Sequence, residues 1–333
     1  MSYFWEKFTD EELLDLELRE LGLVLKDSFR APLINQLLEE LSKKNLKFKP
    51  HFWASDEWFS PEGIPGIAIP FFTLHPRLVR LERKMMGYCE GGTELSFMKL
   101  LRHECGHAID HAFELKDRTE RTKLFGPTHI AYPDSYTYKP YSRAYVRHIG
   151  EGYAQAHPEE DWAETFAVWL TPKSNWRVKY KGWKALDKLN CLNRLMGQIK
   201  GRKPVNKSKE VVDSLADSRL TLRKYYRIKT LSKRVQGRAF FGKKLKSLFS
   251  PVGKISGEKL LLTKKKLIIK RVARKTGLYQ YEVEPMLKDL LKETRTTGLF
   301  VRPGKRRVES ALSDLLVKES IRFKRQGRHR VIM

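Results

Sequence analysis

One stretch constrains the fold of this chain more than any other: the nine residues LLRHECGHA at positions 100–108. Apolar residues on both sides of it recur at helical spacing, which predicts a buried helix. On such a helix His103 and His107 lie on one face, one turn apart. Gly106 lowers helix stability, so its presence predicts that backbone or substrate approaches closely there. The stretch therefore predicts a buried helix that presents two imidazoles on one face.

Two imidazoles at this spacing can bind a single zinc ion, and the pattern H-E-x-x-H is typical of zinc hydrolases. Glu104 follows the first histidine and flanks the metal, where it can take a proton from bound water. The alternative is a chance match within an ordinary core helix. Because the flanking residues favour a buried helix, we predict His103 and His107 as metal ligands, Glu104 as general base and Zn²⁺ as the cofactor.

A catalytic zinc ion takes three protein ligands and keeps one position open for water. The best source of the third ligand is His157–Leu170, where Pro158 and the acids after it predict the start of a helix. Within this helix Glu160 and Glu164 share a stripe with two alanines, which would let it lie close to the histidine helix. We predict Glu160 as the third ligand and Glu164 as the acceptor of a ring N–H from a ligand histidine.

Other assignments of these acids stay open. Capping of a solvated helix start explains Glu159 and Asp161, but not two carboxylates that share a face with alanines. Asp161 and Glu164 remain alternative third ligands. His111 continues the histidine stripe, but it lies one further turn along the helix and would point past the ion. We expect His111 beside the site or at the surface.

The two motifs resemble those of known zinc peptidases. The HECGH helix followed by Glu160-x-x-Ala163-Glu164 resembles the gluzincin metallopeptidases, in which the first Glu of the second motif is the third ligand. More closely, residues 153–167 are similar to the bacterial family of putative zinc-binding metallopeptidases, and the tail Gly327–Val331 has the look of that family. The resemblance extends over most of the chain and implies peptidase activity, with a peptide or protein as substrate.

A further resemblance concerns a tyrosine. Proteases of the anthrax lethal-factor type share the E-x-x-A-E pattern and carry a transition-state tyrosine seven residues before the ligand Glu, a position that Tyr153 holds here. A phenol O–H there could donate to the oxyanion of the tetrahedral intermediate. Residues 132–153 contain other tyrosines and His148, which are alternative donors. Ordinary packing with a satisfied hydroxyl is the alternative role for Tyr153.

Charge is distributed unevenly along the 333 residues. Residues 1–200 hold 29 Lys and Arg against 28 Asp and Glu, whereas residues 201–333 hold 37 against 11. Such asymmetry predicts an anionic partner for the second part, with nucleic acid first and an anionic membrane surface or acidic protein next. A solvated basic surface on a helical region is the alternative. No zinc-finger or RNA-binding signature separates these possibilities.

The start of the chain and its cysteines bear on the compartment. The first residues are not followed by the apolar stretch of a secretory signal, and no apolar run approaches membrane-spanning length. Three scattered cysteines do not form a disulfide framework. We therefore expect a cytoplasmic protein without a transmembrane segment.

Periodicity predicts an α+β fold that is predominantly helical and has a small sheet, with a boundary near residue 200. The resemblance implies that residues 1–200 form a zincin-like catalytic domain, and residues 201–333 form a basic, mostly helical region. Helices are expected at Thr9–Leu21, after Pro32 and at Ala185–Ile199, with strands within Phe48–Trp58 and Ile64–Phe72 and an irregular segment over Phe125–Gly150. In the basic region, helices are expected at Leu220–Arg234, Glu258–Arg274, Glu282–Glu293 and Val308–Ile321. By analogy with zincins, Gly66–Thr73 is a candidate for the sheet edge that pairs with an extended substrate.

These observations favour a zinc-dependent metallopeptidase whose basic second part recruits an anionic partner. Two alternatives remain: a nucleic-acid-associated protein with a regulatory protease domain, and a zinc hydrolase that acts on a non-peptide amide. The intact Glu104 argues against a zinc site without catalysis.

Overall fold

The computed structural model describes residues 3–133, 135–139, 142–150, 152–238, 248–250, 252–277, 298–302, 308–326 and 329–332, with isolated positions between 283 and 295. It is 58% helical and contains a small two-stranded parallel sheet, which confirms the predicted fold class. The chain divides into two compact units, Met1–Lys224 with Arg330–Met333, and Tyr225–His329. We call these the first and second units.

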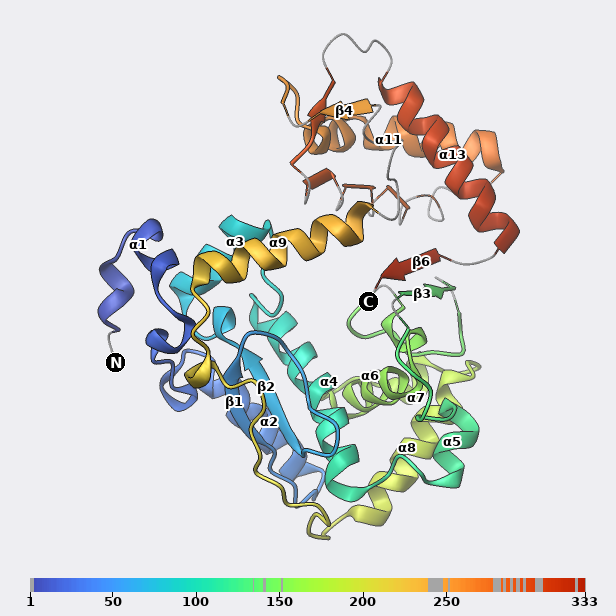
Figure 1. Cartoon of the computed structure of the whole chain (residues 1–333). Coiled ribbons are helices and arrows are strands. Elements are labelled where there is room, and N and C mark those ends of the chain that lie inside the picture. The colour runs from blue at the N-terminus through green and yellow to red at the C-terminus, as the bar shows by residue number, and fades with distance from the viewer. Residues whose placement is uncertain are drawn as a thin grey trace. The chain divides into compact units, whose positions relative to one another are not determined.

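The first unit contains most of the elements in Figure 1. Its helices are α1 (Asp10–Asp15), α2 (Ala31–Lys43), α3 (Pro76–Met86), α4 (Glu94–Phe113), α5 (Thr119–Phe125), α6 (Pro158–Leu170), α7 (Trp176–Lys179) and α8 (Ala185–Ile199). Short 3₁₀ turns are η1 (Phe4–Lys7), η2 (Leu18–Leu21), η3 (Leu25–Asp27), η4 (Phe71–Thr73), η5 (Tyr153–Gln155) and η6 (Leu215–Asp217). The strands β1 (His51–Ser55) and β2 (Gly66–Pro70) are parallel, and β3 (Ser135–Tyr138) pairs with β6 (His329–Ile332).

Helix α4 passes through the core of the first unit and is buried on nearly every side. Its start is fixed by Thr93, whose hydroxyl accepts a hydrogen bond from the Ser96 N–H. Its apolar side chains join one cluster with residues of α2, α6, α8 and both strands of the parallel sheet. Burial around the whole helix, which the apolar flanks predicted, gives the polar residues on α4 a dry and rigid support.

Helices α4 and α6 lie against each other at Gly106. A Cβ atom at Gly106 would lie 2.8 Å from the Cα atom of Ala163, too close for any side chain. The indole of Trp162 donates a 2.9 Å hydrogen bond to the Gly106 carbonyl. The close approach predicted for Gly106 is therefore confirmed, and backbone of α6 makes it.

The parallel sheet is more enclosed than the sequence indicated. Every residue of β2 is buried. Strand β1 pairs with one edge of β2, and on the other side the Ala68 N–H donates to the carbonyl of Phe59 at 2.9 Å. The prediction that the Gly66–Thr73 edge is open for substrate is therefore wrong at Ala68, because the chain's own segment lies there.

Most predicted elements are present, with some shifts of their bounds. The helix predicted over Ala185–Ile199 is α8, with the same ends. The helix predicted over Thr9–Leu21 ends at Asp15, because Leu16 and Leu18 form backbone hydrogen bonds with Leu222 and Leu220. Part of the predicted irregular segment, Ser135–Tyr138, forms a strand.

The second unit is built around α11 (Gly257–Thr276) and α13 (Val308–Gln326), with the short antiparallel pair β4 (Phe249–Ser250) and β5 (Phe300–Val301). Aliphatic side chains of both helices form a separate core. Helix α9 (Leu222–Arg238) spans the change from the first unit to the second. Three predicted basic-region helices thus exist, and the one at Glu282–Glu293 lies largely outside the described residues.

Residues 201–224 belong to the first unit by their contacts. The indole of Trp53 donates to the Val212 carbonyl, and the Ser55 hydroxyl donates to that of Asp213. The predicted domain boundary at residue 200 stays a prediction. Within the described part of the chain, no helix has both the length and the apolar character needed to cross a membrane.

Candidate metal centre

Helix α4 brings two imidazole nitrogens together. The Nε2 atoms of His103 and His107 lie 3.3 Å apart, and both rings are largely buried. Helical geometry explains the arrangement, because residues four apart project from one face with their side chains in adjacent turns. The two nitrogens face the same point next to α6.

Helix α6 places a carboxylate at that point. Oε2 of Glu160 lies 3.0 Å from Nε2 of His103 and 3.6 Å from Nε2 of His107. This oxygen is buried and accepts no hydrogen bond from the described residues. A buried carboxylate oxygen without a donor is costly. A cation bound between the three atoms would remove that cost.

The spacing of the three atoms fits a tetrahedral ion. Ligand atoms on an ion with bonds of about 2.0–2.1 Å and tetrahedral geometry lie about 3.3–3.4 Å apart. The observed separations are 3.0, 3.3 and 3.6 Å. Among the described residues, these three form a group of potential metal ligands whose donor atoms all lie within 4.8 Å of one another. His103, His107 and Glu160 could therefore hold a metal ion.

A second carboxylate of α6 contacts the opposite side of the same histidine. Oε1 of Glu164 lies 3.1 Å from Nδ1 of His103, and Oε2 accepts a 3.0 Å hydrogen bond from the Ile149 N–H. An Nδ1–H that donates to Glu164 leaves the Nε2 lone pair of His103 directed at the site. One turn of α6 thus contacts both nitrogens of one imidazole.

The charges around this group favour an ionised carboxylate. Burial raises the pKa of Glu160, but His107 and His103 lower it more, so the pKa lies well below its usual value. Burial also raises the pKa of Glu104, which the two histidines oppose. Glu104 is 7% exposed and follows His103 on α4. A partly shielded carboxylate beside the two imidazoles is suited to accept a proton.

The structure separates Asp161 from the group. Its carboxylate pairs with the ammonium group of Lys188 on α8, within the core. Burial raises the pKa of Asp161 to about 7, although Lys188 opposes the shift. Among the three acids considered for the third ligand position, Glu160 is the one that approaches both Nε2 atoms.

Tyr153 lies beside His103. Its ring centroid is 5.5 Å from that of His103. Burial raises the pKa of Tyr153, and the carboxylates of Glu160 and Glu104 raise it further, so the hydroxyl stays a donor. Gly152 precedes it with φ of +65° and has the Tyr138 ring against its Cα. His148, an alternative donor, has its Nε2 2.9 Å from the carbonyl of Lys99.

Tyr132 also reaches the site, which the sequence did not indicate beyond its place among several tyrosines. Its hydroxyl lies within hydrogen-bond distance of two carboxylate oxygens, Oε1 of Glu160 at 3.1 Å and Oε2 of Glu159 at 2.8 Å. Its ring stacks on that of His157 with centroids 3.9 Å apart. His111, as expected, is not in the ligand group, and its Nδ1 accepts a hydrogen bond from Gly63.

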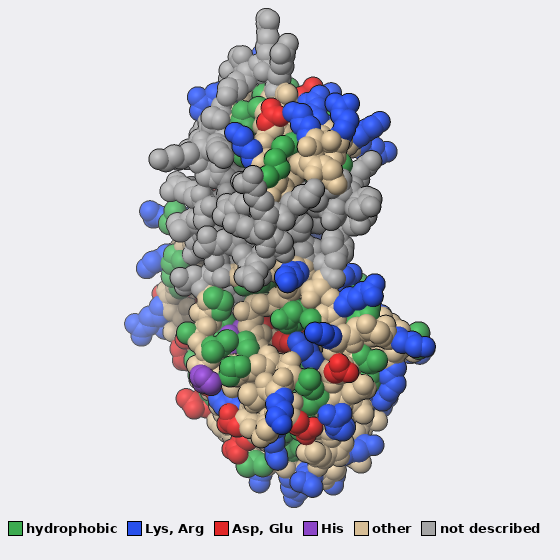
Figure 2. Space-filling model, turned by 90° about the vertical axis from the view of Figure 1, so that its right-hand side faces the viewer, with side chains coloured by type: hydrophobic (Ala, Val, Ile, Leu, Met, Phe, Trp, Pro, Cys, Tyr) green, Lys and Arg blue, Asp and Glu red, His purple; other side chains and the backbone are tan. Residues whose placement is uncertain are grey.

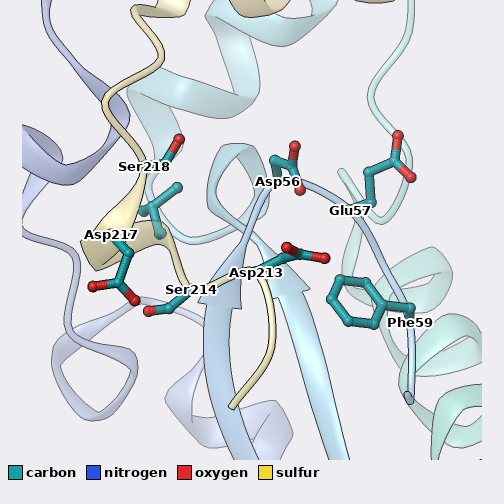
Figure 3. A pocket seen from close by; sticks show the side chains of 8 residues that line it. Asp56, Glu57, Phe59, Asp213, Ser214, Asp217 and Ser218 are labelled. Carbon is teal, nitrogen blue, oxygen red and sulfur yellow. The ribbon is translucent and has the colours of Figure 1, made fainter. Parts of the chain in front are cut away.

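A pocket of about 720 Å³ lies elsewhere in the first unit, beyond the end of β1. Figure 3 shows carboxylates from two segments at its wall. It is lined by Asp56, Glu57, Phe59, Asp213, Ser214, Leu215, Asp217 and Ser218. His103, His107 and Glu160 are not among the residues that line this pocket.

The geometry defines a helical protein with a buried His–His–Glu group that could hold a metal ion. Residues 95–178 match the model of a family described as "Putative zinc-binding metallo-peptidase". The resemblance predicted from the motifs is confirmed over this segment, which includes α4 and α6. No curated protein and no solved structure matches the chain.

Proposed function

We propose that the protein is a zinc-dependent metallopeptidase. The observation that carries the proposal is the convergence of two Nε2 atoms and one carboxylate oxygen at tetrahedral spacing, with that oxygen lacking a donor. Two histidines and a glutamate form a known set of ligands for catalytic zinc. The family match over residues 95–178 supports the same metal and the same class of reaction.

A zinc ion held by His103, His107 and Glu160 would lower the pKa of a bound water and polarise the carbonyl of a substrate. Glu104 accepts the proton of the attacking water and passes it to the leaving amine. Glu164 orients His103 through Nδ1. Tyr153 donates its O–H to the oxygen of the substrate carbonyl as negative charge develops there.

The test combines metal analysis with a peptide library. The full chain is expected to bind one zinc ion and to cleave peptides of the library. Glu104→Gln should retain zinc and lose cleavage by about 100- to 10,000-fold, as expected for the loss of a general base. A protein that binds no zinc, or a Glu104→Gln variant that cleaves like wild type, would contradict the proposal.

We further propose that the basic region, residues 201–333, recruits an anionic partner, with nucleic acid as the first candidate. Of its 37 Lys and Arg, several lie exposed along α11, where Lys259, Lys266 and Lys270 follow one face. Figure 2 shows Lys and Arg gathered on the described part of this region, with few acids among them. Such a surface supports binding to phosphates by the release of counterions.

Salt-dependent binding tests this second proposal. We expect the full chain to be retained on DNA or RNA, with an affinity that falls steeply as salt rises. Strong binding together with weak peptide cleavage would favour a nucleic-acid-associated protein with a regulatory protease domain. An affinity that does not change with salt concentration would contradict the proposal that this region binds a polyanion.

A further inference from the structure

We propose that Tyr132 is a positioning residue for Glu160: its phenol holds one carboxylate oxygen so that the other alone faces the metal. The inference rests on the proposed metal centre and adds a residue that acts through a ligand. It concerns metal affinity and coordination, which can be measured without any substrate.

The contacts divide the two oxygens of Glu160 between two tasks. Oε2 lies 3.0 and 3.6 Å from the histidine nitrogens, whereas Oε1 accepts a 3.1 Å hydrogen bond from the Tyr132 hydroxyl. The carboxylate group is largely buried, so few other donors can reach it. The phenol carries a single hydrogen and also lies 2.8 Å from Oε2 of Glu159, which therefore competes for it.

Tyr132 is held in place at the start of α6. Its ring stacks on the imidazole of His157, with planes 22° apart. Nδ1 of His157 accepts a hydrogen bond from the Glu159 N–H, which makes it the N-cap of the helix. Nε2 of His157 lies 2.9 Å from the carbonyl of Ile130 and donates to it. One imidazole thus joins the segment that carries Tyr132 to the helix that carries Glu160.

The consequence concerns the coordination number. A carboxylate can bind a metal ion through one oxygen or both, and rotation about its last bond exchanges these modes. A hydrogen bond to Oε1 favours one-oxygen binding and leaves a position open for water, which catalytic zinc requires. Partners that orient a ligand in this way change metal affinity by about 10- to 100-fold when they are removed.

The experiment compares four full-length proteins: wild type, Tyr132→Phe, Glu159→Gln and Tyr153→Phe. Competition with a chromophoric chelator gives the Kd for Zn²⁺, and the visible spectrum of the Co²⁺-substituted protein reports coordination number. Tyr132→Phe keeps the ring stack and removes only the hydroxyl, so the protein should fold normally. Tyr153→Phe removes a neighbouring phenol, and Glu159→Gln removes the competing carboxylate.

We expect Tyr132→Phe to raise the Kd for Zn²⁺ by about 10- to 100-fold. Its Co²⁺ absorption should weaken, since five-coordinate Co²⁺ absorbs less than four-coordinate Co²⁺. Both control variants should keep a Kd for Zn²⁺ within about 3-fold of the wild-type value. Unchanged affinity and spectrum in Tyr132→Phe would overturn the inference, as would a Glu159→Gln variant with the same loss, because Tyr132 would then act through Glu159.

The outcome for the metal centre itself is distinguishable. A wild-type protein that binds no Zn²⁺ would overturn the metal centre and this inference together. A wild-type protein that binds Zn²⁺ but cleaves no peptide would overturn the proposed activity alone, and the comparison of Kd values would still decide the role of Tyr132.

Discussion

The interiors of the two units differ in kind. In the first unit, buried charged pairs join the helices around His103, His107 and Glu160. The pairs are Arg102 with Glu40, Arg121 with Asp110, and Lys188 with Asp161. In the described part of the second unit, the buried polar residues are hydroxyls such as Thr294 and Ser313, which donate to carbonyls of their own helices. Its core is otherwise apolar and mostly aliphatic.

This difference indicates how strongly each interior favours a single arrangement of its helices. A buried charged pair contributes little net stability, but losing one partner leaves the other charge unpaired and is costly. Such pairs therefore favour one arrangement of helices over its alternatives. We infer that they help to fix α4 and α6 in the register that brings the three potential ligand atoms together. The second unit has no such constraint in its described residues, and its charges lie at the surface.

The largest expected effect comes from removing one partner of a buried pair. Arg102 donates from Nε and from Nη2 to the two oxygens of Glu40, each at 2.7 Å. Arg102→Met should lower the free energy of unfolding by about 3–5 kcal/mol, because Glu40 stays buried without an opposite charge and keeps only the hydrogen bond from Gln36. Urea unfolding followed by tryptophan fluorescence measures it.

The double variant Arg102→Met with Glu40→Leu is the control, and most of the stability should return in it. If Arg102→Met had the same free energy of unfolding as the double variant, the buried pair would not constrain the first unit, and the proposed difference between the two interiors would be wrong.

The next effect concerns the third ligand. Zinc binding at structural sites is worth about 10–16 kcal/mol in total, so one ligand of four contributes roughly 3 kcal/mol. Glu160→Ala should therefore raise the Kd for Zn²⁺ by about 100- to 1000-fold, as measured by chelator competition. Glu164→Ala should raise it by about 10- to 100-fold, since it acts on His103 from the other side. A larger loss in Glu164→Ala than in Glu160→Ala would reverse the assignment.

A smaller effect is expected at Tyr153, on turnover alone. Tyr153→Phe should lower kcat by about 10- to 1000-fold, judged by other oxyanion donors, with zinc content unchanged. Steady-state cleavage of a peptide found in the library, together with metal analysis, gives both values. Unchanged turnover would exclude Tyr153 as the donor and leave the other tyrosines of residues 132–153 as candidates.

The smallest effect tests the surface of the second unit. Lys266 and Lys270 are exposed on α11, and each phosphate contact contributes about 0.9 to the slope of log affinity against log salt. The variant Lys266→Gln with Lys270→Gln should therefore reduce that slope by about 2 on duplex DNA. The matched control in the first unit, Lys47→Gln with Lys49→Gln, should leave it unchanged. Equal effects of both pairs would show that charge acts without regard to its place in the chain.

Local patterns were sufficient for the elements whose ends depend on their own residues. The helix Ala185–Ile199 has the predicted bounds because its apolar spacing and its neighbours agree. The helix predicted to run from Thr9 to Leu21 is shorter, because residues far along the chain supply backbone hydrogen bonds near Leu16. The edge predicted to be open at Ala68 is covered by the nearby segment at Phe59, because the chain folds back between these two residues, which the pattern of the strand itself does not indicate.

The sequence by itself determined that His103 and His107 share a face and that Gly106 permits a close approach, since both follow from the geometry of a single helix. It favoured Glu160 as the third ligand and left Asp161 and Glu164 as alternatives, because all three lie within about one turn of the same helix. Only the tertiary structure places these acids relative to the histidines: contact between Gly106 and Ala163 sets the register of α4 and α6. In that register Glu160 approaches both Nε2 atoms, Glu164 contacts Nδ1 and Asp161 pairs with Lys188. The place of Tyr132 on Glu160 depends likewise on packing between distant segments, which no local pattern contains.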